Sequence, residues 1–447
     1  MRLNRFLRIS LVALAATTAP APHMPLGLPA VAWAEAKPSS LSVEAARLAL
    51  KGDFVEAGRA AERSGDIAAI KLVELIYLRD RPNDAGYQRI MNFLDIAPNW
   101  PLTEALLKRA ERSLYVNGET PELILTHFDK RKPTTAQGSL ALARALIATG
   151  NIDGARAAVR KAWLNPEITP ELEKDITTEF GKLLTLDDYK QRMWRLLYAQ
   201  ETNAAIRAAK RLPGEYQKAA AVAQKLIRGE AGAEKAYGGL PSAMRQQLAM
   251  KYALVRFYRK NENYSKARAI LLEVPGDAAK MGDAEAWWVE RRIVARRSIG
   301  LDDSGSAKKA AYQIARAHGF AKGEEALEGE FLAGWIALRQ LNDPDTALKH
   351  FGRLGRIAES RTEKARAGYW TGRALEAMGS RGEAKTAYKK AALYSTVYYG
   401  QLAREKVGLG KVPEEIDTGK ASSAAEAKVD KDEVVRAFRI MAEAGSQ

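Results

Sequence analysis

The chain has 447 residues, of which 47% are hydrophobic, enough for about two or three ordinary domains or one long repeat array. It contains no cysteine, which excludes disulfides, thiol nucleophiles and thiolate metal sites. The formal net charge of +16 favours anionic partners.

A secretory signal peptide is predicted over residues 1–34. Three arginines precede an apolar stretch at 9–19, and the Ala-Trp-Ala at 32–34 is a small-x-small cleavage site. Cleavage within the Ala-Glu-Ala at 34–36 fits as well. The apolar stretch is too short for a membrane anchor and is followed by several prolines, so we predict export and no transmembrane segment.

Removal of residues 1–34 takes away three Arg and no acid, which leaves a net charge of +13. In an exported protein this argues against nucleic acid and for peptidoglycan, acidic glycans or lipid head groups. The alternative is a generally solvated basic surface, since no block of five or more like charges marks a dedicated patch.

Short helices are predicted over the first part of the exported chain. Residues 38–80 fit two or three, with Ser39 or Ser40 capping the first. Five prolines divide residues 81–135 into further short helices. Thr120-Pro121 and Thr169-Pro170 each fit a cap followed by Pro at the first helical position.

From residue 139 onward the apolar periodicity is strongly helical, and one turn pattern recurs along the whole chain. A Gly or polar residue is followed, five positions later, by an Ala that opens the next helix. The copies lie at 52–57, 150–155, 262–267, 342–347 and 379–384. Gly65 begins a weaker copy, in which Ile70 replaces the Ala.

This turn pattern predicts stacked helical hairpins. The first residue must tolerate a positive φ, and the Ala must be small because two helices cross beside it. A single hairpin cannot bury its apolar face, so hairpins stack. We therefore predict an all-α superhelical solenoid over residues 35–407, tetratricopeptide-like, for which a closed ring is one arrangement.

The end of the chain differs in composition. Residues 408–432 are polar and lack an apolar stripe, so we predict a linker. Residues 433–447 form one amphipathic helix, and a lone helix after a linker has little to pack on. We expect this helix to be the first of a further domain that the sequence truncates.

The stretch from 364 to 408 carries a family resemblance. Its motifs are Tyr369-Trp370, Arg373-Ala374, the turn at Gly379, Ala384, Tyr388 and Tyr398-Tyr399-Gly400-Gln401. It resembles the end of the superhelical N-terminal domain of soluble lytic murein transglycosylases, and the likeness covers roughly residues 38–447. The resemblance implies a periplasmic, ring-shaped solenoid that precedes a linker domain and a lysozyme-like domain, which cleaves peptidoglycan and leaves an anhydro-sugar.

The family's catalytic Glu-Ser motif, with its following aromatic and Asn-Pro or Asp-Pro pair, does not occur in the sequence. Glu359-Ser360 is the near match, but Arg361 follows it and it lies between two repeat helices. We interpret it as a helix connection and assign no catalytic residue. The chain alone is expected to be inactive.

Other candidate sites are weak. Apart from His23 in the signal, the histidines (His127, His318, His350) lie far apart and form no ligand pair, so no metal site is predicted. The glycines at 300 and 305 have phosphate-loop spacing, but Ser306 stands where Lys is required, and no cofactor is predicted. No Gly-x-Ser-x-Gly elbow supports a triad.

Three aromatic pairs could stack on sugar rings: Trp287-Trp288, Tyr369-Trp370 and Tyr398-Tyr399. Adjacent helix positions point about 100° apart, so at least one member of each pair is expected in the core. The function favoured by these observations is the non-catalytic part of a lytic transglycosylase, with peptidoglycan as partner. The alternatives are a periplasmic tetratricopeptide-like scaffold for envelope proteins and, if the signal were false, a cytoplasmic adaptor.

Overall fold

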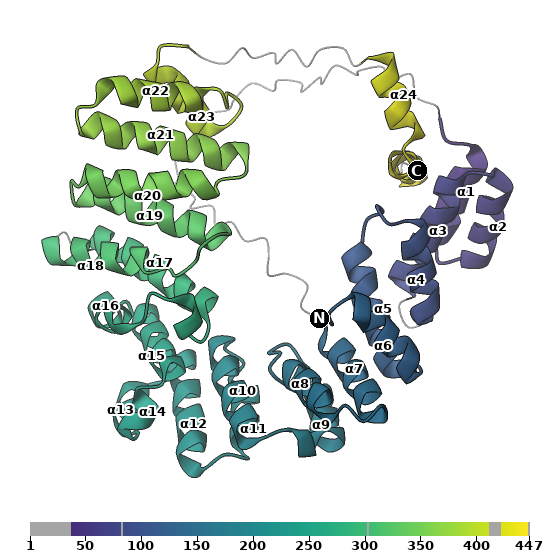
Figure 1. Cartoon of the computed structure of the whole chain (residues 1–447), viewed down its shortest axis with the longest axis horizontal. Helices are drawn as coiled ribbons and strands as arrows, with labels where there is room; N and C mark the ends of the chain where they lie inside the picture. Colours follow the sequence, from purple (N-terminus) through teal and green to yellow (C-terminus); the bar gives the residue numbers. More distant parts are fainter. Residues whose placement is uncertain (1–36, 82–83, 302–303, 411–421, 446–447) are drawn as a thin grey trace, which may run out of the picture. The chain divides into compact units, whose positions relative to one another are not determined.

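The computed structural model describes residues 37–81, 84–301, 304–410 and 422–445. Helices and their connecting turns build all of these segments, and no strand occurs within them (Figure 1). The predicted all-α class is confirmed. The helices fall into two compact units, one from residues 1–73 and 421–447 and one from residues 74–420.

The first unit joins helices from both ends of the sequence. They are α1 (Ser40–Leu50), α2 (Phe54–Ser64), the first half of α3 (Ile67–Asp80), α24 (Ser423–Lys431) and α25 (Glu433–Gly445). α25 packs against α1 and buries Ile440. Two ion pairs join α25 to the beginning of α3: Lys71 with Glu433 (2.6 Å) and Arg436 with Asp66 (2.9 Å).

The second unit is a succession of helices, beginning with the rest of α3. It continues with α4 (Gly86–Ile96), α5 (Thr103–Asn117), α6 (Pro121–Lys130), α7 (Ala136–Ala148), α8 (Ile152–Trp163), α9 (Pro170–Glu179), α10 (Leu186–Tyr198), α11 (Thr202–Ala209), α12 (Gly214–Arg228), α13 (Ala233–Gly238) and α14 (Ser242–Arg245). It ends with α15 (Leu248–Lys260), α16 (Tyr264–Glu273), α17 (Ala284–Leu301), α18 (Gly305–Arg316), α19 (Glu324–Gln340), α20 (Pro344–Ile357), α21 (Arg361–Ala377), α22 (Arg381–Ala392) and α23 (Tyr398–Lys406).

Neighbouring helices of the second unit pack in pairs, and each pair packs on the next. The clearest hairpins are α7–α8, α10–α11, α15–α16, α19–α20 and α21–α22 (Figure 1). One core extends continuously from α7 to α19, and smaller clusters continue it to α23. This stacking is the solenoid that the turn pattern predicted.

The recurring turn has one backbone geometry. The φ angle of its first residue is positive in every copy: 86° at Gly52, 80° at Gly150, 58° at Glu262, 51° at Asn342 and 80° at Gly379. The Ala five positions later is buried in all five: Ala57, Ala155, Ala267, Ala347 and Ala384. A sixth copy begins at Gln200 (φ 64°) and ends at the fully buried Ala205. Gly65 also has a positive φ (63°), but Ile70 is 41% exposed, so no close crossing forms there.

The predicted helix caps are confirmed. Ser39 accepts a hydrogen bond from the backbone of α1, and Thr120 and Thr169 do the same for α6 and α9. Pro121 and Pro170 occupy the first helical position in the latter two.

The structure can be compared with the predicted signal, linker and C-terminal helix only where it describes those residues. The predicted signal, residues 1–34, lies outside them, and so does the linker between 411 and 421. The segment 423–431, predicted to be linker, is helical (α24). The expectation that the helix after it has little to pack on is wrong, because α25 packs on α1. The proposed domain boundaries and a ring remain predictions. Within the described segments, no helix has both the length and the apolarity needed to cross a bilayer.

Candidate functional site

A groove of about 960 Å³ crosses α20, α21 and α22 in the second unit. Most of its lining residues are Gly, Ala or Leu, and Lys364 and Lys390 are its basic side chains. Leu393 lies at the end of α22 and is 81% exposed. The groove therefore combines an apolar, largely side-chain-free wall with two exposed ammonium groups.

Capping and close packing hold the three helices that form the groove. Asp343 caps α20, and Ser360 forms a capping box with Glu363 at the beginning of α21. α21 and α22 approach closely because Gly372 faces the ring of Tyr388, where a Cβ would lie 2.5 Å from a ring carbon. A glycine is required at this contact.

The glycines that line the groove on α20 have no such packing reason. A Cβ on Gly352 would have its nearest neighbour at 3.9 Å, and one on Gly355 at 3.7 Å, both ordinary contacts. Glycine within a helix costs roughly 0.5–1 kcal/mol relative to alanine. The effect of these two glycines is to leave the groove wall open.

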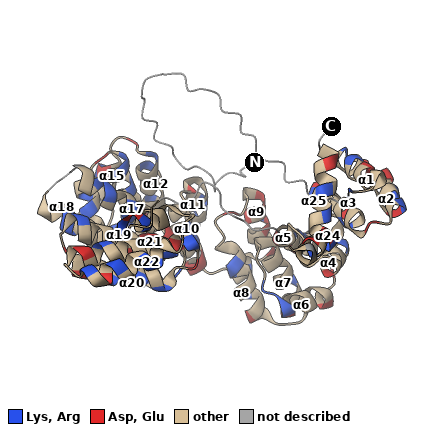
Figure 2. Cartoon of the chain, turned by 90° about the horizontal axis from the view of Figure 1, so that it is seen from above, with Lys and Arg blue, Asp and Glu red and all other residues tan. Residues whose placement is uncertain are grey.

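The three helices that form the groove carry a net positive charge. Residues 344–394 contain eleven Lys and Arg against five Asp and Glu, a net of +6 in 51 residues. Figure 2 shows basic and acidic positions interleaved over the helices of both units. Lys364 and Lys390 have no ion-pair partner among the described residues.

A buried polar cluster lies where α18, α19 and α20 meet. Glu330 accepts a hydrogen bond from His350 Nδ1 at Oε2 (2.6 Å) and one from Arg353 Nε at Oε1 (2.8 Å). His318 Nε2 lies 3.5 Å from the same Oε1. The Tyr312 hydroxyl lies 3.1 Å from His350 Nε2. Burial alone would raise the pKa of Glu330, but the hydrogen bonds from the imidazoles and the guanidinium outweigh it and hold the pKa well below its usual range.

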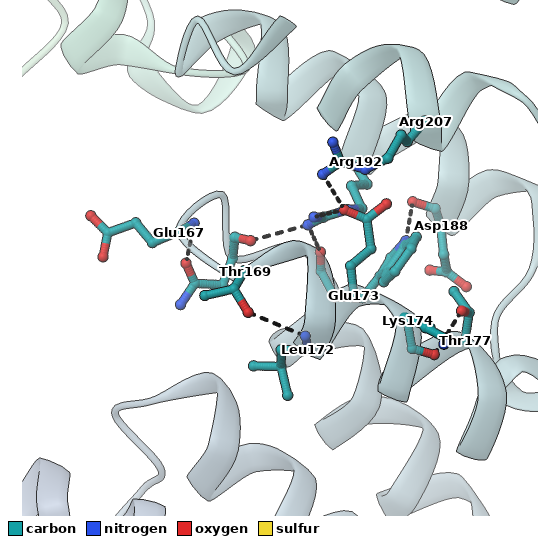
Figure 3. A network of polar contacts seen from close by, with 11 residues as sticks. Glu167, Thr169, Leu172, Glu173, Lys174, Thr177, Asp188, Arg192 and Arg207 are labelled. Atoms are coloured by element: carbon teal, nitrogen blue, oxygen red, sulfur yellow. Dashed lines mark hydrogen bonds and ion pairs between the residues drawn. The ribbon is translucent and has the colours of Figure 1, made fainter. Parts of the chain in front are cut away.

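A second buried network ties α8, α9, α10 and α11 together (Figure 3). Glu173 on α9 accepts from Arg192 (3.2 Å) and Arg207 (2.9 Å). Arg192 is 1% exposed and also donates to the backbone carbonyl oxygens of Trp163 (2.5 Å) and Asn165 (3.1 Å). Burial lowers the pKa of Arg192, and the Glu173 carboxylate opposes that change. The contacts connect helices, which is a structural role.

The carboxyl groups of Glu328, Glu330 and Glu376 are poorly suited to general-acid catalysis. A glycosidase acid needs a raised pKa, so that it holds a proton at neutral pH. Each described carboxyl group with a displaced pKa has it lowered, as at Glu328, Glu330 and Glu376. Hydrogen bonds and ion pairs from neighbouring cations cause the net lowering at these three positions, against the effect of burial.

The structure brings together two of the histidines that are distant in sequence. His318 and His350 meet on Glu330, while His127 lies in another part of the second unit, against Tyr87 (3.0 Å). The sequence carried no signal for this meeting, because neither histidine has a partner at helical spacing. Among the residues that the structure describes, no three His, Asp or Glu side chains are arranged so that they could hold a metal ion.

The near match to the catalytic motif, Glu359-Ser360, lies at the beginning of α21. Ser360 is the N-cap of α21, and the Glu363 carboxylate accepts from the backbone amides of Glu359 and Ser360. Ser304 caps α18 within the glycine-spaced segment, and Gly300 lies in α17.

The aromatic pairs lie mainly in the core. Trp287 and Trp288 are both buried, and so is Tyr369, with Trp370 packed beside it. Tyr398 is 68% exposed and is the one member of the three pairs with an open ring. A sugar-stacking platform of paired rings is therefore not formed by these residues.

No model of a known protein family matches the sequence, and no curated protein matches it. Solved structures do share its fold. The lytic transglycosylase Slt from Pseudomonas aeruginosa, determined as an inactive mutant, has a TM-score of 0.53 at 17% identity over 91% of this chain. The 70-kDa soluble lytic transglycosylase of Escherichia coli has a TM-score of 0.50 at 16% identity over 92%.

A complex of a 70-kDa soluble lytic transglycosylase with bulgecin A gives a TM-score of 0.50 at 16% identity over 91% of this chain. The chain spans 64% to 66% of the length of these structures. The resemblance noted in the sequence is thus confirmed at the level of the fold.

Proposed function

We propose that this chain is the non-catalytic helical part of a periplasmic peptidoglycan lytic transglycosylase. It would position glycan strands or partners for a lysozyme-like catalytic domain outside residues 1–447. The observation that carries this proposal is the shared fold, which extends over 91% to 92% of the chain in enzymes named for that activity.

Three further features support the proposal. The Tyr-Tyr-Gly-Gln segment at 398–401 belongs to the resemblance noted in the sequence. The predicted signal would take the chain to the compartment that contains peptidoglycan. The net charge of +13 on residues 35–447 suits an anionic polymer.

Retention on purified sacculi tests the proposal. Residues 35–447 should sediment with peptidoglycan at low salt and be released at several hundred millimolar, because exposed charge interactions are screened beyond about 10 Å at 0.1 M. Failure to bind at low salt would contradict a peptidoglycan role based on charge. Salt-resistant binding would indicate aromatic stacking instead.

A matched digestion tests the non-catalytic assignment. The same protein should release no anhydro-muropeptides from the sacculi, whereas a complete lytic transglycosylase used as control should. Release that disappears when one acidic residue is replaced would identify a catalytic site in this chain.

A second candidate function is a periplasmic scaffold for envelope proteins. The groove across α20, α21 and α22 favours it, because an open apolar wall between helical hairpins can receive a peptide. Binding to an envelope protein without retention on sacculi would support this function over the first.

A further inference from the structure

We infer that the groove across α20, α21 and α22 binds an acidic peptide segment with aliphatic side chains, supplied by a partner protein. This inference does not depend on whether the chain contacts peptidoglycan. It rests on the chemistry of the groove alone.

The size of the groove suits a short peptide. Its volume is about 960 Å³, at the upper end of the ~300–1,000 Å³ range that is usual for ligand sites. Its wall is open along α20 because Gly352 and Gly355 carry no side chain, although the surrounding atoms would accept a Cβ. A peptide backbone can therefore approach this helix closely.

The charge selects the acidic class of peptide. Lys364 on α21 and Lys390 on α22 both line the groove, and both are exposed and without a described acidic partner. Glu383 is the one acidic residue of the lining. The surrounding 51 residues carry a net charge of +6, so a segment rich in Asp and Glu is attracted and a basic one is repelled.

The apolar lining favours a peptide over a glycan strand. Leu393 contributes aliphatic surface, since it is 81% exposed, while the other leucine of the lining, Leu375, is buried. Of the two aromatic residues in the lining, Phe351 is fully buried and offers no ring face to a sugar, and Tyr394 is half-buried. The uncharged polar side chains that could bond sugar hydroxyls are Thr371, Thr386 and Tyr394, and the Thr386 hydroxyl already donates to the carbonyl oxygen of Gly382.

The test is fluorescence anisotropy with residues 35–447 and a labelled twelve-residue peptide that alternates acidic and aliphatic residues. The wild type should bind it, and a peptide with Lys in place of each acid should not bind. Reversal of both groove lysines, Lys364→Glu with Lys390→Glu, should weaken binding roughly 20-fold. The matched control is Lys385→Glu with Lys389→Glu, which reverses two exposed neighbours outside the lining and should leave affinity within about twofold.

A second pair of variants separates the groove from general charge. Gly352→Ala with Gly355→Ala should keep or raise the melting temperature, since both are helical positions with space for a Cβ. The same double variant should bind the peptide more weakly. Gly58→Ala in α2, another helical glycine with open space, should leave binding unchanged. Because the filled groove remains folded, a loss of binding cannot come from unfolding.

Several outcomes would overturn the inference. These are equal binding of the acidic and basic peptides, equal loss when the control lysines (385 and 389) and the groove lysines (364 and 390) are reversed, and unchanged binding after both glycines are replaced. Displacement of the peptide by glycan strands from which the peptide stems have been removed would assign the groove to sugar. Self-association of the free chain that the lysine reversals abolish would assign it to a second copy.

Discussion

At the scale of single residues, Glu330 shows how this fold uses buried charge. Its carboxylate, on α19, accepts hydrogen bonds from His350 and Arg353 of α20 and lies 3.5 Å from His318, two residues after the end of α18, so its contacts join three consecutive segments of the array. The buried Arg291 is bonded to backbone carbonyl oxygens instead of to a charged partner. It donates to the backbone carbonyls of Val274 and Pro275 (both 2.8 Å), and burial lowers its pKa to about 10.

The stability that Glu330 contributes should depend on pH. Its pKa is lowered in the folded chain, whereas an unfolded Glu titrates near ~4.3. The stabilisation is therefore fully present above that pH and is lost as the pH falls toward the folded pKa. Relative to wild type, Glu330→Gln should lower the free energy of unfolding by about 1–3 kcal/mol at pH 7.

The difference between the two proteins should shrink when urea unfolding is repeated near pH ~3.5. Glu324→Gln, at an exposed position in the same helix, should stay close to wild type at both values. A difference that stays constant across the two pH values would contradict the assigned role of the Glu330 carboxylate.

At the residue scale, the sequence predicts contacts with neighbouring backbone but not contacts between distant side chains. Turn and cap residues act on backbone next to them, so Gly150 and Thr120 were predictable from a short window. Glu330 and His350 are 20 positions apart, and their contact depends on how α19 crosses α20. The groove glycines were missed for the same reason, since a Gly in a helix gives no sign of the space beside it.

At the scale of elements, the hairpin turn is set by one backbone conformation that different residues adopt. Glycine enters the positive-φ region without strain, while other L-residues pay roughly 1–2 kcal/mol. Glu262 and Gln200 are both in that region, although neither side chain favours it. Both also fit the pattern of a polar residue five positions before an Ala, and of the two only the copy at Glu262 was identified from the sequence.

The turn predicts two substitutions of opposite sign. Gly150→Ala should destabilise by about 1 kcal/mol, although a Cβ there would meet no atom within 4 Å, because the cost lies in the backbone. Gln200→Gly should be neutral or stabilising, since it relieves the same strain. Thermal unfolding of both variants checks this, and a loss of stability in both would mean that side-chain contacts decide the turn.

The packing of α25 on α1 is a second testable element. Ile440 is 1% exposed and Phe438 is 66% exposed on the same helix. Ile440→Ala should cost about 2–5 kcal/mol of local stability and raise hydrogen exchange in α1. Phe438→Ala should change neither, and similar exchange in the two variants would show that α25 does not protect α1.

At the scale of the whole molecule, the sequence predicted a helical array and its class, and the fold similarity extends that to the named enzymes. It did not predict that helices from the two ends of the sequence share one compact unit. That grouping depends on contacts between positions almost 400 apart, such as Arg47 with the backbone of Glu443 (3.2 Å). No local pattern encodes a contact of that range.

The one-after-another packing of the second unit has a mechanical consequence. Because each hairpin is held mainly by the hairpins on either side, a pulling force along the array should release one at a time. The Ala347 to Ala384 spacing is 37 residues, so each release should lengthen the chain by roughly 130 Å at most. The absence of cysteine allows unique thiol handles for optical tweezers at exposed positions outside the strained turns, such as Glu167 and Lys385. A sawtooth of small, similar steps is expected, whereas one abrupt extension would show that the hairpins yield together, and that the array is rigid rather than compliant.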